Sequence, residues 1–258
     1  CQGHQGPSYE LQNYLHDNNI DIVLATETFL KPGTYFGIPN YITHRNDRPT
    51  IGGGTAIIIK NNIPHTLLDL PRQETFEASG ICLCIYQRET AVIACYKQPR
   101  KKLIERDLQA LLDHRPHTII AGDLNAKHPT WHSKIPNPAG EKLHQLQITL
   151  GIAITAPDEP TFYHCVYDYE DVLDVIIAKN ASVANVQVHN VLSSDHLPVN
   201  FTICGSTHTA QITRTIRATD WEAYEREVPQ NTALTNKTTT QQIQQPIDNL
   251  NPTNTTRQ

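Results

Sequence analysis

The chain has 258 residues, and 38% of them are hydrophobic, which is enough for one large α/β domain or two small ones. Its formal net charge of −5 excludes a protein that holds nucleic acid by overall positive charge alone. No run approaches the roughly 18 apolar residues of a membrane span, and six cysteines without CxxC spacing argue against a zinc site or a disulfide framework.

The predicted elements are mostly strands, with three helices among them. In chain order, we predict a helix at 9–19, strands at 20–25, 55–59, 81–86 and 91–96, a helix at 103–113, a strand at 118–121, a helix at 140–150, and strands at 171–177, 186–192 and 197–203. Only a few helices separate these strands. The pattern therefore favours an α/β fold of stacked mixed sheets with helices outside over a doubly wound parallel sheet.

The composition changes after Cys204. Residues 206–258 are dominated by Thr, Gln and Asn, with a single helix-like island around Trp221. Polar tracts of this kind rarely bury enough surface to fold alone. We therefore predict one domain at residues 1–203 and a polar linker at 204–258.

A short apolar strand at 118–121 leads directly into Gly122, Asp123, Leu124 and Asn125. Because strand side chains alternate, we expect Asp123 and Asn125 to point to the same face at the end of this strand. A carboxylate beside an amide suits a phosphate whose attacking water must be held in line. The alternative is a turn that caps the next helix.

Other polar groups also follow predicted strands. They are Thr26-Glu27-Thr28, Tyr96 with Lys97-Gln98-Pro99, Asp171-Val172-Leu173-Asp174 and Ser194-Asp195-His196. Together with the Asp123 motif, and in this order, they resemble the endonuclease/exonuclease/phosphatase superfamily. The resemblance is closer to the apurinic-type endonuclease domain of jockey-like non-LTR retrotransposons, and it spans residues 1–203. Further matching segments lie at 41–48, 52–56, 126–131, 137–140, 157–161 and 197–198.

The resemblance implies a DNase I-like, four-layered α/β sandwich and a Mg²⁺-dependent phosphodiesterase, with Mn²⁺ as an alternative ion. His196 is expected to be the general base because its ordinary pKa lies near the working pH, and Asp174 is expected to orient it. Asp123 would orient the attacking water or support the leaving oxygen. Asn125 and Tyr96 would donate hydrogen bonds to the phosphate.

Glu27 and, by resemblance, Asp195 are expected at the metal, since Mg²⁺ takes one or two carboxylates and keeps most of its waters. Candidate contacts to the DNA backbone are Lys97, Arg100, Lys101, Lys102, Arg45 and Arg48. A charge run is also typical of a solvated surface, and the two arginines also fit a set of surface salt bridges. The sequence leaves these alternatives open.

The chain departs from the family at its start. Family members begin with a strand that ends in an aromatic residue and a site Asn, whereas residues 1–3 match the segment just after it. We expect an unfilled position in a sheet, and a longer parent protein as the better candidate for activity. The absence of methionine also favours a fragment of a longer polyprotein.

The resemblance also names expected partners and a place of action. They are target-site duplex DNA, a following reverse transcriptase domain and, indirectly, the element RNA, with action in the nucleus and a cytoplasmic location otherwise. No membrane association or secretion is expected. Two alternatives stay open: another phosphoesterase of the same superfamily, and an inactive DNA-binding remnant.

Overall fold

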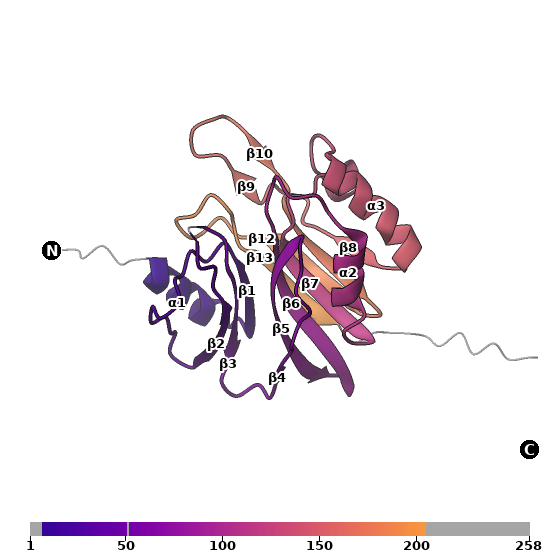
Figure 1. Ribbon diagram of the computed structural model, residues 1–258. Coiled ribbons are helices and arrows are strands. Elements are labelled where there is room, and N and C mark those ends of the chain that lie inside the picture. Colours follow the sequence, from indigo (N-terminus) through magenta and orange to yellow (C-terminus); the bar gives the residue numbers. More distant parts are fainter. Residues whose placement is uncertain (1–6, 51, 205–258) are drawn as a thin grey trace, which may run out of the picture. The chain divides into compact units, whose positions relative to one another are not determined.

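A computed structural model of the chain describes residues 7–50 and 52–204 (Figure 1). The helices of this part are α1 (Pro7–Asp17), α2 (Glu105–Leu112) and α3 (Pro138–Leu150), with a 3-10 turn η1 (Pro129–Trp131). None of the described helices is long and apolar enough to cross a membrane. The predicted linker at 204–258 lies outside the described residues except for Cys204, so it stays a prediction.

The largest sheet has six strands in the order β4-β5-β6-β7-β11-β8. Their bounds are β4 (Thr66–Leu67), β5 (Phe76–Ile85), β6 (Arg88–Lys97), β7 (His117–Asp123), β8 (Ala153–Thr155) and β11 (Asp174–Lys179). Strands β6 and β7 are parallel and joined through α2, whereas the other neighbours are antiparallel. The mixed sheet agrees with the fold predicted from the sequence.

Two smaller sheets pack on one face of the large sheet. One has the order β1-β3-β2, formed by β1 (Ile22–Thr26), β2 (Tyr41–Asn46) and β3 (Thr55–Lys60), and the other pairs β12 (Ser182–Val188) with β13 (Val199–Cys204). Ile57 and Ile59 of β3 meet Val92 of β6 in a core that has almost no exposed surface. Burial of apolar strands between the sheets is the main source of stability.

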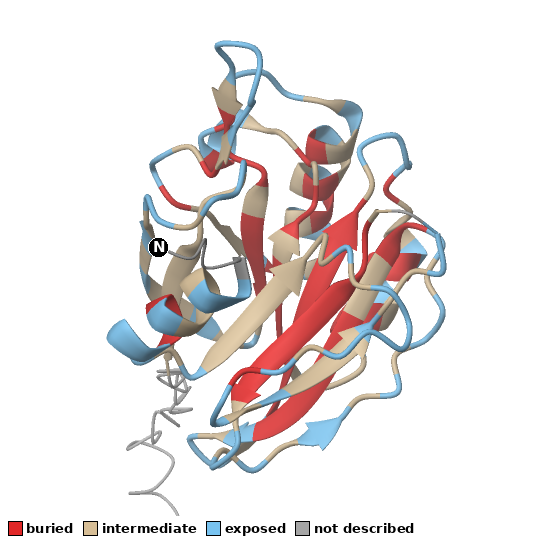
Figure 2. Cartoon of the chain, turned by 90° about the vertical axis from the view of Figure 1, so that its left-hand side faces the viewer, coloured by how far each residue is buried: buried red, intermediate tan, exposed pale blue. Residues whose placement is uncertain are grey.

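Helices cover the two outer faces. Leu108 of α2 and Leu143 of α3 pack on the far side of the large sheet, against residues such as Ile120. Leu15 of α1 packs on the outer side of the β1-β3-β2 sheet, against Ile58. The order helix, sheet, sheet, helix confirms the predicted four-layered α/β sandwich, and Figure 2 shows the buried strands inside exposed loops.

Local sequence explains where α3 begins and ends. The Asn137 side chain accepts a hydrogen bond from the Gly140 amide at 2.8 Å, which caps the first turn. Gly151 ends the helix with a φ of +61°, a left-handed conformation that glycine adopts at low cost. The predicted helix at 140–150 is therefore confirmed, and it begins two residues earlier, at Pro138.

Several strand predictions needed correction. The predicted strand at 171–177 is divided into β10 (Glu170–Asp171) and β11, because residues 172–173 interrupt the ladder. The predicted strand at 186–192 is displaced, since β12 already begins at Ser182 and ends at Val188. Strands β2 and β9 (Phe162–Tyr163) were not predicted, and β9 pairs with β10 in a separate hairpin beside the site described below.

A groove lies between the facing edges of two strands. Among the described strands, β1 pairs with β3 alone and β13 pairs with β12 alone. A cavity of about 320 Å³ lies along both strands, with side chains of Asp174 and His196 in its lining.

Candidate functional site

Strand register places the first two carboxylates of the site. Strands β7 and β11 are antiparallel neighbours in which Asp123 lies directly opposite Asp174. The end of β1 approaches the same edge, because a Cβ at Gly122 would lie 2.7 Å from the Thr26 side chain and 2.3 Å from the Cys95 carbonyl oxygen. Gly122 also has a φ of +144°. Its lack of a side chain therefore permits the close approach that brings Glu27 to this edge.

His196 comes from the segment between β12 and β13, here called the His196 loop (residues 189–198). Its Nδ1 pairs with Asp174 Oδ2 at 2.9 Å, and its Nε2 lies 3.9 Å from Asp123 Oδ2. The side chain of His196 retains 25% of its exposure, whereas that of Asp123 retains 4%. The structure therefore brings together the predicted base, its orienting carboxylate and the predicted water-binding carboxylate, and leaves the imidazole accessible.

Burial and charge shift the pKa of both His196 and Asp123. Burial alone would lower the pKa of His196, but the hydrogen bond and charge of Asp174, with the charges of Asp123 and Asp195, raise it to about 9. Burial and the negative charges of Asp174 and Glu27 hold the pKa of Asp123 well above its usual range. Perturbed groups gathered around a surface opening are typical of functional sites.

Asn125 joins this group in a different way from the one predicted. It lies beyond the end of β7 with a φ of +45°, so strand alternation does not place it. Its backbone amide donates to Asp123 Oδ1 at 2.8 Å, and its Nδ2 donates to Asp123 Oδ2 at 2.7 Å and to the Lys97 carbonyl at 3.1 Å. Asn125 is thus next to Asp123, as expected, and its amide holds that carboxylate in place.

Tyr96 and Glu27 lie together at the same edge. Tyr96 is near the end of β6 and is 4% exposed, and its hydroxyl faces the Glu27 carboxylate. Burial, followed by Glu27 and Asp123, raises the Tyr96 pKa far above its ordinary value, so the hydroxyl stays protonated. Tyr96 is therefore a permanent hydrogen-bond donor, as the predicted contact to phosphate requires.

The carboxylates at this edge are candidate ligands for a divalent cation. The described residues contain no group of three or more His, Cys, Asp or Glu side chains close enough to enclose a metal. Mg²⁺ does not need such a group, because it keeps several waters and takes one or two carboxylates. Glu27 and Asp174 both raise the Asp123 pKa by their negative charge, so the edge carries negative charge that a cation would offset. The residues present therefore fit a hard cation.

The expected DNA-contact residues fall into two groups. Lys97 has no exposed surface, and its Nζ donates to the carbonyls of Gln98, Pro99 and Lys101. The prediction that Lys97 contacts DNA is therefore wrong, because the turn that follows β6 encloses its ammonium group. Arg100, Lys101 and Lys102 are exposed, as a backbone contact requires.

Arg45 and Arg48 are engaged inside the protein. Arg45 pairs with Asp47 and donates to the Thr34 carbonyl at 2.7 Å, and Arg48 pairs with Glu77. Of the two alternatives left open by the sequence, the structure favours a salt-bridge set for both arginines.

Two residues that support the site were not assigned a role from the sequence. Thr161 is fully buried, and its Oγ1 accepts hydrogen bonds from the backbone amides of Leu173 at 3.1 Å and Asp174 at 3.2 Å. Phe162 places its ring 5.0 Å from the His196 ring. Segment 157–161, which precedes β9, is one of the segments noted in the sequence as matching the family. Nothing in that segment indicated which of its side chains supports β11.

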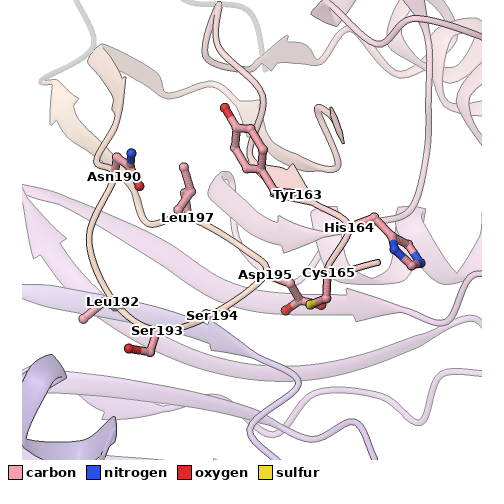
Figure 3. A pocket seen from close by; sticks show the side chains of 9 residues that line it. All are labelled: Tyr163, His164, Cys165, Asn190, Leu192, Ser193, Ser194, Asp195 and Leu197. Carbon is pink, nitrogen blue, oxygen red and sulfur yellow. The ribbon is translucent and has the colours of Figure 1, made fainter. Parts of the chain in front are cut away.

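The His196 loop and the β9–β10 hairpin enclose a second cavity beside the site. It has a volume of about 570 Å³ and is lined by Tyr163, His164, Cys165, Asn190, Leu192, Ser193, Ser194, Asp195 and Leu197 (Figure 3). Asp195 is exposed here, and its backbone oxygen accepts from the Tyr163 amide at 2.8 Å. The predicted metal residue Asp195 therefore lies in an open cavity next to the imidazole.

Comparison with known proteins relates the chain to mobile-element proteins. A family model described as endonuclease-reverse transcriptase matches residues 90–200. The chain is 30% identical over 200 residues to the RNA-directed DNA polymerase from mobile element jockey of Drosophila melanogaster, covering 74% of this chain and 22% of that protein. It is 25% identical over 252 residues to a probable RNA-directed DNA polymerase from transposon BS of the same fly, covering 93% and 28%. The chain spans about a quarter of the length of these relatives.

Solved structures share the fold. The endonuclease domain of TRAS1, a telomere-specific non-LTR retrotransposon, is similar with a TM-score of 0.64 and 20% identity, covering 78% of this chain and 94% of that one. The AP endonuclease LMAP from Leishmania major has a TM-score of 0.58 and 13% identity, covering 77% and 83%. At these identities the likeness establishes the fold.

Proposed function

The chain belongs to the DNase I-like endonuclease/exonuclease/phosphatase superfamily, among the endonuclease domains of non-LTR retrotransposons, and we propose that it nicks one strand of target duplex DNA. The nick would leave a 3′-hydroxyl that primes reverse transcription. The observation that carries this proposal is His196, held between Asp174 at 2.9 Å and Asp123 at 3.9 Å in an accessible position.

His196 is the proposed general base. Because Nδ1–H donates to Asp174, the basic lone pair lies on Nε2, which is the nitrogen directed toward Asp123. A water bound between Nε2 and Asp123 would give its proton to Nε2 as its oxygen attacks phosphorus. The bond between phosphorus and the 3′ oxygen would break, and the leaving oxygen would take a proton from solvent water, which produces a 3′-hydroxyl and a 5′-phosphate.

The other residues of the edge act on the phosphate. Tyr96 is expected to donate a hydrogen bond to a phosphate oxygen as negative charge develops there. Asn125 fixes the carboxylate of Asp123, so the attacking water is held in one orientation. Thr161 fixes the start of β11 and thereby Asp174. Each of these groups is in place before substrate arrives, which reduces the reorganisation needed during the reaction.

We propose Mg²⁺, or Mn²⁺, as the cofactor, with Glu27 as a carboxylate ligand and Asp195 nearby. When bound, the cation would supply positive charge that polarises the phosphate and offsets the carboxylates that raise the His196 pKa. The support is the negative charge at the edge and the carboxylate chemistry of Glu27, which suits a hard cation.

The proposed partners follow from the same relatives. Their names describe RNA-directed DNA polymerases, so we infer a reverse transcriptase domain in the same polyprotein and indirect contact with the element RNA. Exposed Arg100, Lys101 and Lys102 are the proposed contacts to the DNA backbone. Chromosomal DNA as the substrate implies action in the nucleus.

Nicking of supercoiled plasmid tests the proposal. We expect Mg²⁺-dependent nicks that EDTA abolishes, and loss of nicking in His196→Ala and Asp195→Ala. The assay is run on this chain and on a form extended upstream by about ten residues, the length of a strand with its turn. Nicking at wild-type rates by both variants would show that the site is wrongly assigned. Hydrolysis of small phosphoesters without nicking would instead favour another phosphoesterase.

A further inference from the structure

A carboxylate on α1 contacts the His196 loop. Glu10 Oε2 accepts a hydrogen bond from the Ser193 backbone amide, and Glu10 Oε1 accepts one from Ser193 Oγ, both at 3.0 Å. The two residues are 183 positions apart in the chain. The contact therefore fixes a tertiary arrangement and is not a local turn.

Among the described residues, the arm of the loop that receives this contact makes few other hydrogen bonds, although Leu192 packs against the cluster around Tyr14. Leu192 has a φ of +71°, which is disfavoured for a residue with a branched side chain. Ser193, Ser194 and Asp195 are exposed, and all three line the cavity beside His196 (Figure 3). A disfavoured conformation in an exposed segment persists only when contacts hold it. The Glu10 carboxylate supplies two such contacts.

The other parts of the loop are fixed independently. Its two ends are joined by the hydrogen bond from the His189 amide to the Pro198 carbonyl at 2.9 Å. Backbone bonds from Tyr163 to Asp195 and from Leu197 to Thr161, each 2.8 Å, hold the far arm to the β9 region. The arm from 191 to 194 thus lies between two fixed points, and α1 is the element that braces it.

Helix α1 is itself anchored next to the loop. The hydroxyl of Tyr14 donates to Asn200 Oδ1 at 2.8 Å, and the Tyr14 ring meets the His189 ring edge-on at 5.8 Å. Leu192 packs against the cluster around Tyr14. Because Tyr14 lies one helical turn after Glu10, this anchor sets the position from which the carboxylate reaches Ser193.

We propose that Glu10 is a positioning residue, which fixes the His196 loop so that Asp195 and His196 are held at the reaction centre. This inference rests on the proposed nicking activity for its catalytic consequence, but not for the loop contact itself. A carboxylate is suited to the task because it accepts from two donors at once, and bonds to a charged acceptor are stronger than neutral ones.

Two substitutions and a matched control test the role. Glu10→Ala removes both acceptors. Glu10→Gln keeps an acceptor for the Ser193 amide and offers a donor to the Ser193 hydroxyl, so it is expected to retain most of the contact that fixes the loop. Asp17→Ala removes an exposed carboxylate from the same helix and serves as the control. Circular dichroism and unfolding temperature verify that each variant is folded.

The first readout is amide hydrogen exchange in a peptide covering the His196 loop. Loss of two bonds to a charged group is expected to speed exchange there by about 5- to 30-fold in Glu10→Ala. Glu10→Gln should lie close to wild type, and Asp17→Ala should be unchanged. The second readout is nicking, in which Glu10→Ala is expected to lower kcat by a similar factor and to leave KM unchanged.

The outcomes distinguish failure of the proposed role of Glu10 from failure of the proposed nicking activity. Unchanged loop exchange in Glu10→Ala, or an equal increase in Asp17→Ala, would overturn the role of Glu10. Faster exchange with an unchanged kcat would also overturn it, because the loop would then move without consequence for the reaction. If the wild-type protein does not nick, the proposed function fails, and loop exchange still decides whether Glu10 holds the loop.

Discussion

Replacing Asp174 with asparagine tests the orientation of His196. The substitution keeps the size of the side chain and removes the charge that faces Nδ1 at 2.9 Å. An amide in this place is able to donate to Nδ1, which would leave the proton on Nε2 and block the base. Because general-base catalysis contributes about 10²- to 10⁴-fold, we expect Asp174→Asn to lower kcat by a factor in this range.

The same substitution has a direct physical signature. The His196 pKa of about 9, against an ordinary value of 6.5, corresponds to at most about 3 kcal/mol in favour of the imidazolium. Asp174 is the leading group that raises it. We therefore expect the pKa of His196 in Asp174→Asn to fall toward 6.5, by at least about one pH unit, which is about 1.4 kcal/mol.

Proton NMR titration of the His196 ring in EDTA measures this pKa without interference from metal. Asp69→Asn removes an exposed carboxylate elsewhere and controls for the change in net charge. An unchanged His196 pKa in Asp174→Asn, or an equal fall in Asp69→Asn, would refute the pairing of Asp174 with His196. A large fall in pKa with an unchanged nicking rate would refute the role of that pairing in the reaction.

Three further predictions concern stability. Gly140→Ala should cost about 3 kcal/mol of unfolding free energy, because its Cβ would lie 1.8 Å from the Lys127 carbonyl oxygen. Gly151→Ala should cost only about 1 kcal/mol, because a Cβ at Gly151 would meet open space and only the left-handed backbone is strained. Equal losses of unfolding free energy for the two variants in urea would contradict this difference. Lys97→Met should lower the unfolding free energy by about 1 kcal/mol, because the Gln98 and Lys101 carbonyls lose their donor. It should leave the salt dependence of DNA binding unchanged. A weaker salt dependence would show that Lys97 does contact DNA. Without metal, the raised His196 pKa gives stability that is fully present below pH 6.5 and is lost as the pH rises through about 9. Urea unfolding at both ends of this pH range should show that the wild type loses at most about 3 kcal/mol of unfolding free energy as the pH rises. The control His196→Ala should not show this loss.

The layers of the fold and the pairing of Asp174 with His196 were predicted from the resemblance to the endonuclease/exonuclease/phosphatase superfamily. Apolar runs of strand length marked the buried strands, and the order of the polar groups after them carried the resemblance. The strands predicted at 81–86 and 91–96 leave four residues between them, but β5 and β6 are joined through Tyr86 and Gln87 alone, both with positive φ. Neither residue is the Gly or Asn that normally reveals such a turn, so its length was not readable.

Tertiary partners explain the remaining differences. Lys97 belongs to a basic run that resembles a solvated surface, yet the carbonyls of the turn after β6 enclose its ammonium group. Thr161 supports Asp174 from 13 residues away, and Glu10 reaches Ser193 across 183 residues. Contacts of this kind depend on how the elements pack, and no local pattern in the sequence encodes them.

The most direct test of the central claim is the chemistry of the nick itself. Supercoiled plasmid is treated with the protein and Mg²⁺, and the product is offered to a DNA polymerase with labelled nucleotides. The account predicts label at nicks made by the wild-type protein, none with EDTA and none with His196→Ala, because only a 3′-hydroxyl is extended. Nicks that cannot be extended, or equal labelling with His196→Ala, would contradict it.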